Sequence, residues 1–220
     1  GGIGPRQDSN PFTRARMPVL RELLDGDLPF HDRPQVETQR ATLLALDATL
    51  GVDGLPQSGT GQTTLFTGRN AAAHIGEHSG PYPDHRLLPF LAENNLFHQT
   101  LALSKTVACA NAYPDIFHQR IARGTDRRSA LSQAVGVAGV PYRTEEDLLA
   151  GRAVSASLTN ERWPGRNGQP SLITAQQAGC NFARLSRDFD LTVFEFFLTD
   201  VAGHRPARLS AVAILERLDE

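Results

Sequence analysis

The sequence has few cysteines, no excess of basic residues and no long apolar segment. Cys109 and Cys180 are its only cysteines, too few for a disulfide framework, which predicts a reducing, cytoplasmic location. The formal net charge is −2 at pH 7, so no basic surface is expected to bind nucleic acid. No apolar run reaches the roughly 18 residues that a membrane-spanning helix needs. These absences argue against nucleic-acid and membrane partners.

What is present is typical of a globular protein. The chain has 220 residues, 40% of them hydrophobic and 21% charged. This length is enough for one domain with an ordinary core, or for one domain with a small insertion.

One stretch, Leu55–Gly68, combines three glycines with five hydroxyl side chains and has no charged residue. It follows the apolar run 41–46, so we expect a strand that leaves the core and turns into a helix. The start of such a helix presents free N–H groups and the positive end of the helix dipole. An anion is favoured at that position, and a hydroxyl placed there is a candidate nucleophile.

Three other interpretations of this stretch are possible. A phosphate-binding nucleotide loop fits poorly, because Gln62 occupies the lysine position and Pro56 occupies the first glycine position. The nucleophile elbow G-x-S-x-G does not fit, because the motif has glycine two residues before and two residues after the serine, and Ser58 has Pro56 and Thr60 at these positions. A helix cap with no further role is the remaining alternative.

A second stretch near the end of the chain strengthens the functional interpretation. Residues 191–198 are rich in β-branched and aromatic side chains, which predicts a strand buried on both faces of a parallel sheet. Asp200 then lies at the carboxyl edge of the sheet, where ligands collect in open α/β folds. Asp200 and His204 are four residues apart, so on a helical turn both can bind one metal ion. A further buried strand, 106–110, places Asn111 at the same edge.

His74 and His78 form another pair with a spacing of four. Gly76 lies between them and Gly80 follows, so a regular helix is not expected there. We expect a surface or substrate-facing loop rather than a metal pair. Because this loop directly follows the predicted nucleophile helix, it is a candidate for contact with substrate.

These residues resemble the alkaline phosphatase superfamily, and within it the branch of cofactor-independent phosphoglycerate mutase and phosphopentomutase. In that branch a serine or threonine nucleophile lies about ten residues before a helix glycine and is followed by a Gly-His or Gly-Gln step. Ser58, the pair Gly61-Gln62 and Gly68 match this pattern. The branch also has an Asp-x-x-Gly-His motif after a buried strand, which residues 200–204 match. The resemblance covers both ends of the chain and leaves the middle uncovered.

The resemblance implies a fold and an activity. The fold is α/β, a mostly parallel sheet with helices on both faces, with residues 1–113 and 171–220 as the core and 114–170 as a small cap-like insertion. The activity is metal-dependent phosphoryl transfer by a phosphatase, phosphomutase or phosphodiesterase acting on a small phosphate ester. Two divalent metal ions, zinc or manganese, are implied as cofactors. Their ligands in this chain are Ser58, Asp200 and His204.

The remaining candidate residues have lesser roles in this hypothesis. Thr60 is the rival nucleophile, because it lies two residues after Ser58 and carries the same chemistry. Substrate contacts are expected from four other side chains: Gln62, His74, His78 and Asn111.

The family also has ligands that this sequence lacks. Its members begin with a strand that ends in a metal-binding aspartate, and they carry an Asp-His-Gly motif, which does not occur here. We therefore expect these residues to be a piece of a longer protein that supplies the absent ligands. The alternative is a non-catalytic binding protein on the same fold.

Overall fold

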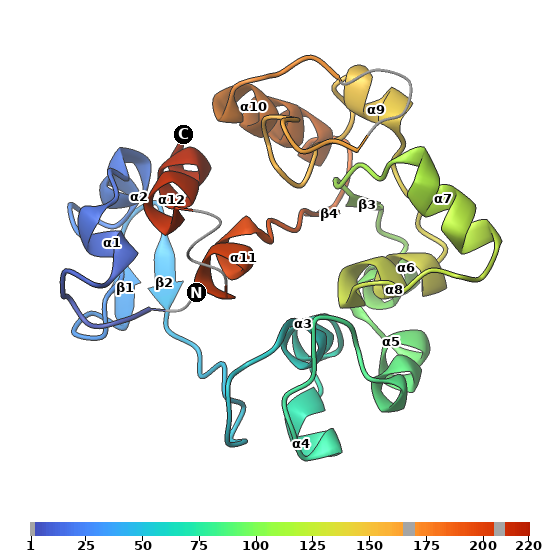
Figure 1. The fold of residues 1–220 in the computed structure, drawn as a ribbon, viewed down its shortest axis with the longest axis horizontal. Helices are drawn as coiled ribbons and strands as arrows, with labels where there is room; N and C mark the ends of the chain where they lie inside the picture. The colour runs from blue at the N-terminus through green and yellow to red at the C-terminus, as the bar shows by residue number, and fades with distance from the viewer. Residues whose placement is uncertain (1–2, 165–169, 205–209) are drawn as a thin grey trace. The chain divides into compact units, whose positions relative to one another are not determined.

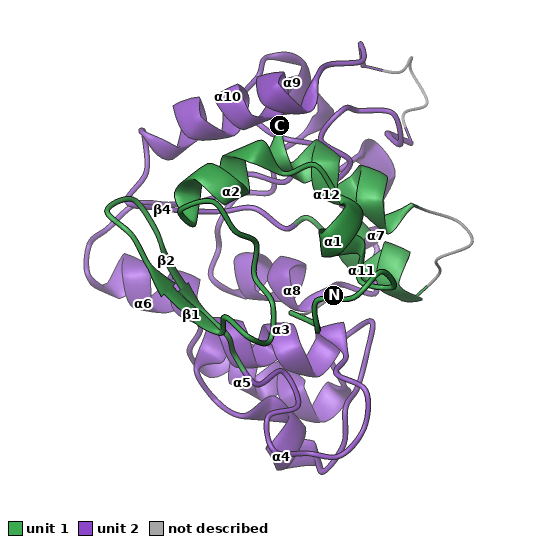
Figure 2. Cartoon of the chain, turned by 90° about the vertical axis from the view of Figure 1, so that its left-hand side faces the viewer, with its two compact units in different colours: residues 1–46, 196–220 green, residues 47–195 purple. Residues whose placement is uncertain are grey.

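The computed structural model describes residues 3–164, 170–204 and 210–220 (Figure 1). The chain divides into two compact units, which Figure 2 shows in different colours. The first unit combines residues 1–46 with residues 196–220, and the second comprises residues 47–195. Each unit is described by itself.

The first unit joins the two ends of the chain. Its elements are α1 (Pro11–Arg14), α2 (Pro18–Leu23), β1 (Gln35–Glu37), β2 (Thr42–Leu44), α11 (Leu198–His204) and α12 (Ala211–Asp219). Helix α2 begins with a proline and has no side-chain cap of its own. Asp219 of α12 supplies that cap, because its carboxylate accepts the N–H groups of Val19 and Leu20 at 2.9 and 2.8 Å. The two ends of the chain are thus held together by a helix cap.

Two clusters of buried side chains are found among the described residues of the first unit. One contains Ala15, Met17, Leu28, Phe30 and Leu215. The other packs α11 against α12 through Leu198, Ala202 and Ile214. Helix α11 is therefore fixed by its buried face, which leaves its other residues toward solvent.

The second unit is larger and mostly helical. Its elements in chain order are α3 (Ser58–Thr67), α4 (Ala71–Ile75), the 3₁₀ helix η1 (His85–Leu87), α5 (Leu88–Glu93), α6 (Leu96–Ala102), β3 (Val107–Cys109), α7 (Asp115–Ala122), α8 (Ala130–Val137), α9 (Glu145–Leu149), α10 (Ala175–Ser186) and β4 (Leu191–Val193). Its main core buries β3 between helices, with Leu91, Phe97 and the apolar face of α8 around it. Trp163 is buried in a smaller cluster with Ala112, Leu148 and Ala153.

The strands form two small sheets. In the second unit β3 pairs in parallel with β4, with Val107 opposite Leu191 and Cys109 opposite Val193. In the first unit β1 pairs antiparallel with β2. The prediction of an α/β fold is confirmed, since the structure is mixed α/β. Within the described ranges, however, the strands do not extend into one mostly parallel sheet.

The structure corrects two of the predicted strands. The run 41–46 forms β2, but Leu44 and Leu46 are exposed rather than buried. Strand β4 ends at Val193, so the second half of the apolar run 191–198 is not strand, and Asp200 lies in helix α11 instead of at the end of that strand.

The predicted helices agree better with the structure. Helix α3 ends at Gly68, which adopts a left-handed conformation with φ 68°. Pro89 lies in the first turn of α5, where proline is tolerated, and it does not interrupt that helix. The predicted insertion 114–170 falls within the second unit, although residues 165–169 lie outside the described residues. Among the helices described, each is too short or too polar to span a bilayer.

Candidate functional site

Ser58 is the first residue of α3 and is half-buried. Gln57, which precedes it, has an extended backbone and makes no side-chain hydrogen bond to the helix start. Within the described part of the chain, no hydrogen-bond partner is found for the Ser58 hydroxyl. The serine therefore lies where the backbone N–H groups of the helix favour negative charge.

The four threonines of α3 are used structurally. Each hydroxyl donates to a main-chain carbonyl: Thr60 to Gln57 at 3.2 Å, Thr63 to Gly59 at 2.6 Å, Thr64 to Thr60 at 3.0 Å and Thr67 to Thr63 at 2.7 Å. Such local bonds satisfy hydroxyls inside a helix. Thr60 is also fully buried. The geometry therefore favours Ser58 over Thr60 as the nucleophile.

The loop from Ser79 to Tyr82 packs against the start of α3. The Thr60 N–H donates to the Ser79 carbonyl at 3.0 Å, so one N–H group of the helix start is already satisfied. Gly59 permits this approach, because a Cβ at that position would lie 2.3 Å from the Tyr82 oxygen and 2.6 Å from the Ser79 oxygen. The loop thus fixes the position of the start of α3.

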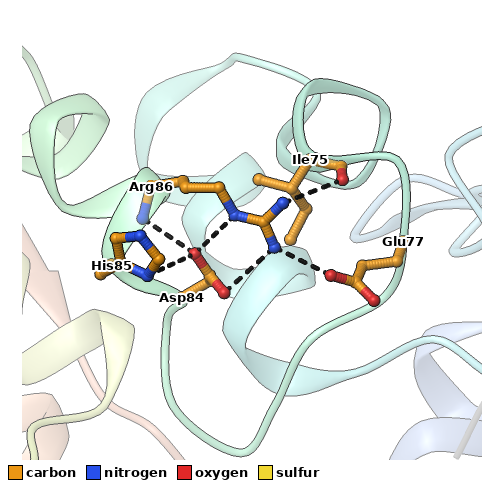
Figure 3. A network of polar contacts seen from close by, with 5 residues as sticks. All are labelled: Ile75, Glu77, Asp84, His85 and Arg86. Carbon is orange, nitrogen blue, oxygen red and sulfur yellow. Dashed lines mark hydrogen bonds and ion pairs between the residues drawn. The ribbon is translucent and has the colours of Figure 1, made fainter.

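Arg86 joins the segments that precede and follow this loop (Figure 3). Its guanidinium contacts Asp84 at 2.8 and 3.1 Å on one side, and on the other it contacts Glu77 at 2.8 Å and the Ile75 carbonyl at 3.3 Å. The hydrogen bonds from Arg86 hold the pKa of the Asp84 carboxyl well below its usual range. His85 adds a contact to Asp84 at 3.2 Å.

Gln62 and Asn111 meet at Glu195, which follows β4. The Gln62 side-chain N–H donates to the Glu195 carboxylate. The Asn111 amide donates to the Glu195 carbonyl at 2.9 Å and accepts its N–H at 2.8 Å. Because Gln62 lies four residues after Ser58, this network anchors the same face of α3 that begins with the serine. Sequence reasoning missed Glu195, although it is the only charged residue in the apolar run 191–198.

Two other side chains near the end of β3, Cys109 and Tyr113, are poor nucleophiles. Cys109 is buried beside Asn111, and burial raises the pKa of its thiol to about 11. Burial likewise raises the pKa of the Tyr113 hydroxyl well above its ordinary value. Both groups stay protonated at neutral pH, which leaves them structural.

The two histidines of the predicted loop, His74 and His78, lie in different local structures. His74 lies in the last turn of α4, where its ring packs on Phe90 with centroids 4.5 Å apart. His78 lies beyond the left-handed Gly76, and its Nε2 is 3.1 Å from the Val52 carbonyl oxygen. The loop expected for both histidines therefore holds only for His78, because His74 lies within α4. His74 is engaged in packing, whereas His78 lines a cleft beside α3.

Asp200 and His204 lie on one face of α11 in the first unit. The Asp200 Oδ1 and His204 Nε2 atoms are 3.6 Å apart, and both side chains are partly exposed. Two ligands of a tetrahedral zinc ion lie about 3.4 Å apart, so the pair fits two adjacent coordination positions. The helical turn that the spacing required is therefore present.

A complete metal centre needs more than this pair. Among the residues that the structure describes, no group of three or more His, Cys, Asp or Glu is placed to hold a metal ion. Ser58 belongs to the second unit, whereas Asp200 and His204 belong to the first.

Comparison of the chain with models of protein families, with curated proteins and with solved structures finds no match.

Proposed function

We propose that this chain belongs to a metal-dependent phosphoryl-transfer enzyme of the alkaline phosphatase superfamily, with Ser58 as its nucleophile. The observation that carries the proposal is the contrast among the hydroxyls of α3. The threonines donate to main-chain carbonyls, whereas the Ser58 hydroxyl is found without a partner in the described residues. The serine also occupies the helix position at which an anion is stabilised.

Asp200 and His204 would hold one of the two divalent ions, zinc or manganese, through Oδ1 and Nε2. A bound divalent ion makes a serine hydroxyl nucleophilic at neutral pH by favouring its ionised form. The predicted metal contact of Ser58 is part of this proposal. So is the larger α/β core, in which the parallel pair β3 and β4 would be part of a more extensive sheet.

The reaction is an in-line displacement at phosphorus. The Ser58 oxygen forms a bond to phosphorus as the ester oxygen leaves, and the serine proton ends on the departing alcohol. Water or an acceptor hydroxyl then displaces the serine oxygen, which regains a proton. The Thr60 N–H already donates to the Ser79 carbonyl, so the N–H groups of Ser58 and Gly59 would stabilise the phosphoryl oxygens.

The test compares three variants of the full-length protein on p-nitrophenyl phosphate and bis-p-nitrophenyl phosphate, with zinc or manganese added. We expect Ser58→Ala to abolish ester hydrolysis and phosphorylation of the protein by the substrate. Thr60→Val and the control Ser186→Ala should retain both. Loss in the Thr60 variant alone would transfer the nucleophile role to Thr60. A folded full-length protein that hydrolyses neither ester would leave the non-catalytic binding protein as the function.

A further inference from the structure

Strand β2 forms an edge of the two-stranded sheet in the first unit, where it lies beside β1 (Figure 2). The Ala45 N–H donates to the Pro34 carbonyl at 2.7 Å. Because the backbone groups of successive residues point to opposite sides of an antiparallel strand, those of Thr42 and Leu44 point away from β1. In the part of the chain that the structure describes, no hydrogen-bond partner is found for these outward N–H and C=O groups.

The side chains along this edge are aliphatic and exposed. Leu44 is 58% exposed and Leu46 is 77% exposed, and residues 41–46 carry no charge. Val36 of β1 is buried opposite Leu43, so Leu44 lies on the other face of the sheet, away from that buried residue. Natural proteins usually protect an unpaired edge with charged residues, proline or a covering segment. Strand β2 has neither a charge nor a proline, and its edge is exposed.

An extended strand would satisfy this edge, because it offers N–H and C=O groups at the same spacing. A second copy of β2 fits in the antiparallel orientation. When Leu44 lies opposite its copy on a two-fold axis, Thr42 lies opposite the Leu46 of the second copy. The exposed leucines of both copies then form one apolar cluster on the outer face of the sheet. Since residues 41–46 are uncharged, no like charges are placed opposite each other.

The charges that flank this run are complementary in the antiparallel orientation. Arg40 precedes the run and Asp47 follows it, so the arginine of each copy comes next to the aspartate of the other. Arg40 contacts Glu22 through Nη2, and its Nε and Nη1 have no partner among the described residues. Hydrogen bonds from Thr49 lower the pKa of Asp47, so this carboxyl is charged at neutral pH. A parallel copy would instead place like charges together.

We propose that two copies of this chain associate through β2, which joins their two-stranded sheets into one four-stranded antiparallel sheet. The central pair is Leu44 with its copy, and it exchanges two backbone hydrogen bonds. Both copies contribute the same edge, so the contact closes at a dimer. The contact does not involve Ser58, Asp200 or His204, so it is independent of the proposed function.

The first test combines Leu44→Cys with Cys180→Ser, which removes the exposed native thiol, in the full-length protein. The Cα atoms of a hydrogen-bonded antiparallel pair lie about 5.5 Å apart, within the range of about 4.4–6.8 Å that a disulfide spans. We expect mild oxidation to give a covalent dimer. Leu65→Cys in the same background is the control, because Leu65 is 70% exposed on α3, and it should remain a monomer on a non-reducing gel. Equal crosslinking of both variants, or of neither, would overturn the proposal.

The second test measures self-association by sedimentation velocity over a series of concentrations. We expect wild-type dimers that dissociate on dilution, since a short strand gives a small contact. Leu44→Pro removes the N–H that points away from β1 and should raise the Kd of the dimer by about tenfold, whereas Leu44→Ile keeps that N–H and should leave the Kd unchanged.

Circular dichroism checks that the variants fold. Leu44→Lys, which places two like charges on the two-fold axis, replaces the proline variant if the latter does not fold. A wild-type protein that stays monomeric at every concentration would contradict the association through β2. So would a dimer whose Kd is the same in the wild type and in the folded proline or lysine variant.

Discussion

The side-chain amide of Gln62 donates to the carboxylate of Glu195, which joins α3 to the residue that follows β4 by two positions. The Asn111 side chain binds both backbone groups of the same glutamate. Helix α3 is therefore attached to the carboxyl ends of both parallel strands, although Asn111 and Gln62 lie 84 and 133 positions from Glu195 in the sequence.

Replacing Gln62 by methionine should destabilise the second unit. The change removes a hydrogen bond to a charged group, which is worth about 1–3 kcal/mol. Urea unfolding measures the loss, and a double-mutant cycle with Glu195→Gln should show coupling between the two positions. Gln99→Met, at an exposed position on α6, is the control. Equal effects of the two methionine variants would show that the Gln62 contact contributes nothing.

The same network explains which parts of the fold the sequence predicts. Helix α3 is predicted by local sequence signals, because the residues at its start and the glycine after its last residue, Gly68, are close together in the sequence. Strand β4 ends early for a reason outside its own sequence. Glu195 uses its backbone N–H and carbonyl on the Asn111 side chain rather than on a strand, and only tertiary packing brings these residues together.

For the candidate site, local spacing was predictable from the sequence, whereas hydrogen bonding and burial were not. Spacing placed Asp200 and His204 on one helical face, and the structure confirms that turn. The resemblance favours Ser58 by its distance from Gly68, with Thr60 as the rival, since both are hydroxyls near the helix start. The choice between them depends on which hydroxyl bonds to the backbone and on the burial of Thr60, neither of which is a property of the local sequence.

Two glycines on α3 should respond in opposite directions to alanine. At Gly59 a Cβ would overlap the Tyr82 and Ser79 carbonyl oxygens, so Gly59→Ala should cost about 1–3 kcal/mol or displace the loop. At Gly61 a Cβ meets nothing within 4 Å, so Gly61→Ala should stabilise the helix by about 0.5–1 kcal/mol. Urea unfolding and limited proteolysis of the loop measure both. Equal stabilisation by the two alanines would mean that the loop does not pack on α3 in solution.

Asp190 should make stability depend on pH in the acid range. Its carboxylate accepts the Thr106 N–H and hydroxyl and pairs with Lys105, which lowers its pKa from 3.8 to about 2. A carboxyl pKa that is lower in the folded protein than in the unfolded chain stabilises the fold at pH values above the unfolded-state pKa. This stabilisation is lost as the pH falls through the folded-state pKa of about 2.

The measurement is urea unfolding of Asp190→Asn and wild type at about pH 5 and about pH 2. We expect the variant to be less stable at the higher pH and the difference to shrink at the lower one. Asp188→Asn, an exposed neighbour, is the control. A difference between Asp190→Asn and wild type that is the same at both pH values would contradict the assigned pKa shift.

Asp200 and His204 should each weaken metal binding when replaced. Asp200→Asn and His204→Gln keep the size of the side chains but remove a carboxylate charge or an imidazole ligand. Even residues that merely support metal ligands change affinity about 10–100-fold when mutated, so each variant should lose tenfold or more in zinc or manganese affinity. Isothermal titration of the full-length protein measures this, with Glu37→Gln, an exposed carboxylate in β1, as the control. Unchanged affinity in both variants would reduce the 3.6 Å contact to an ion pair on the surface of α11.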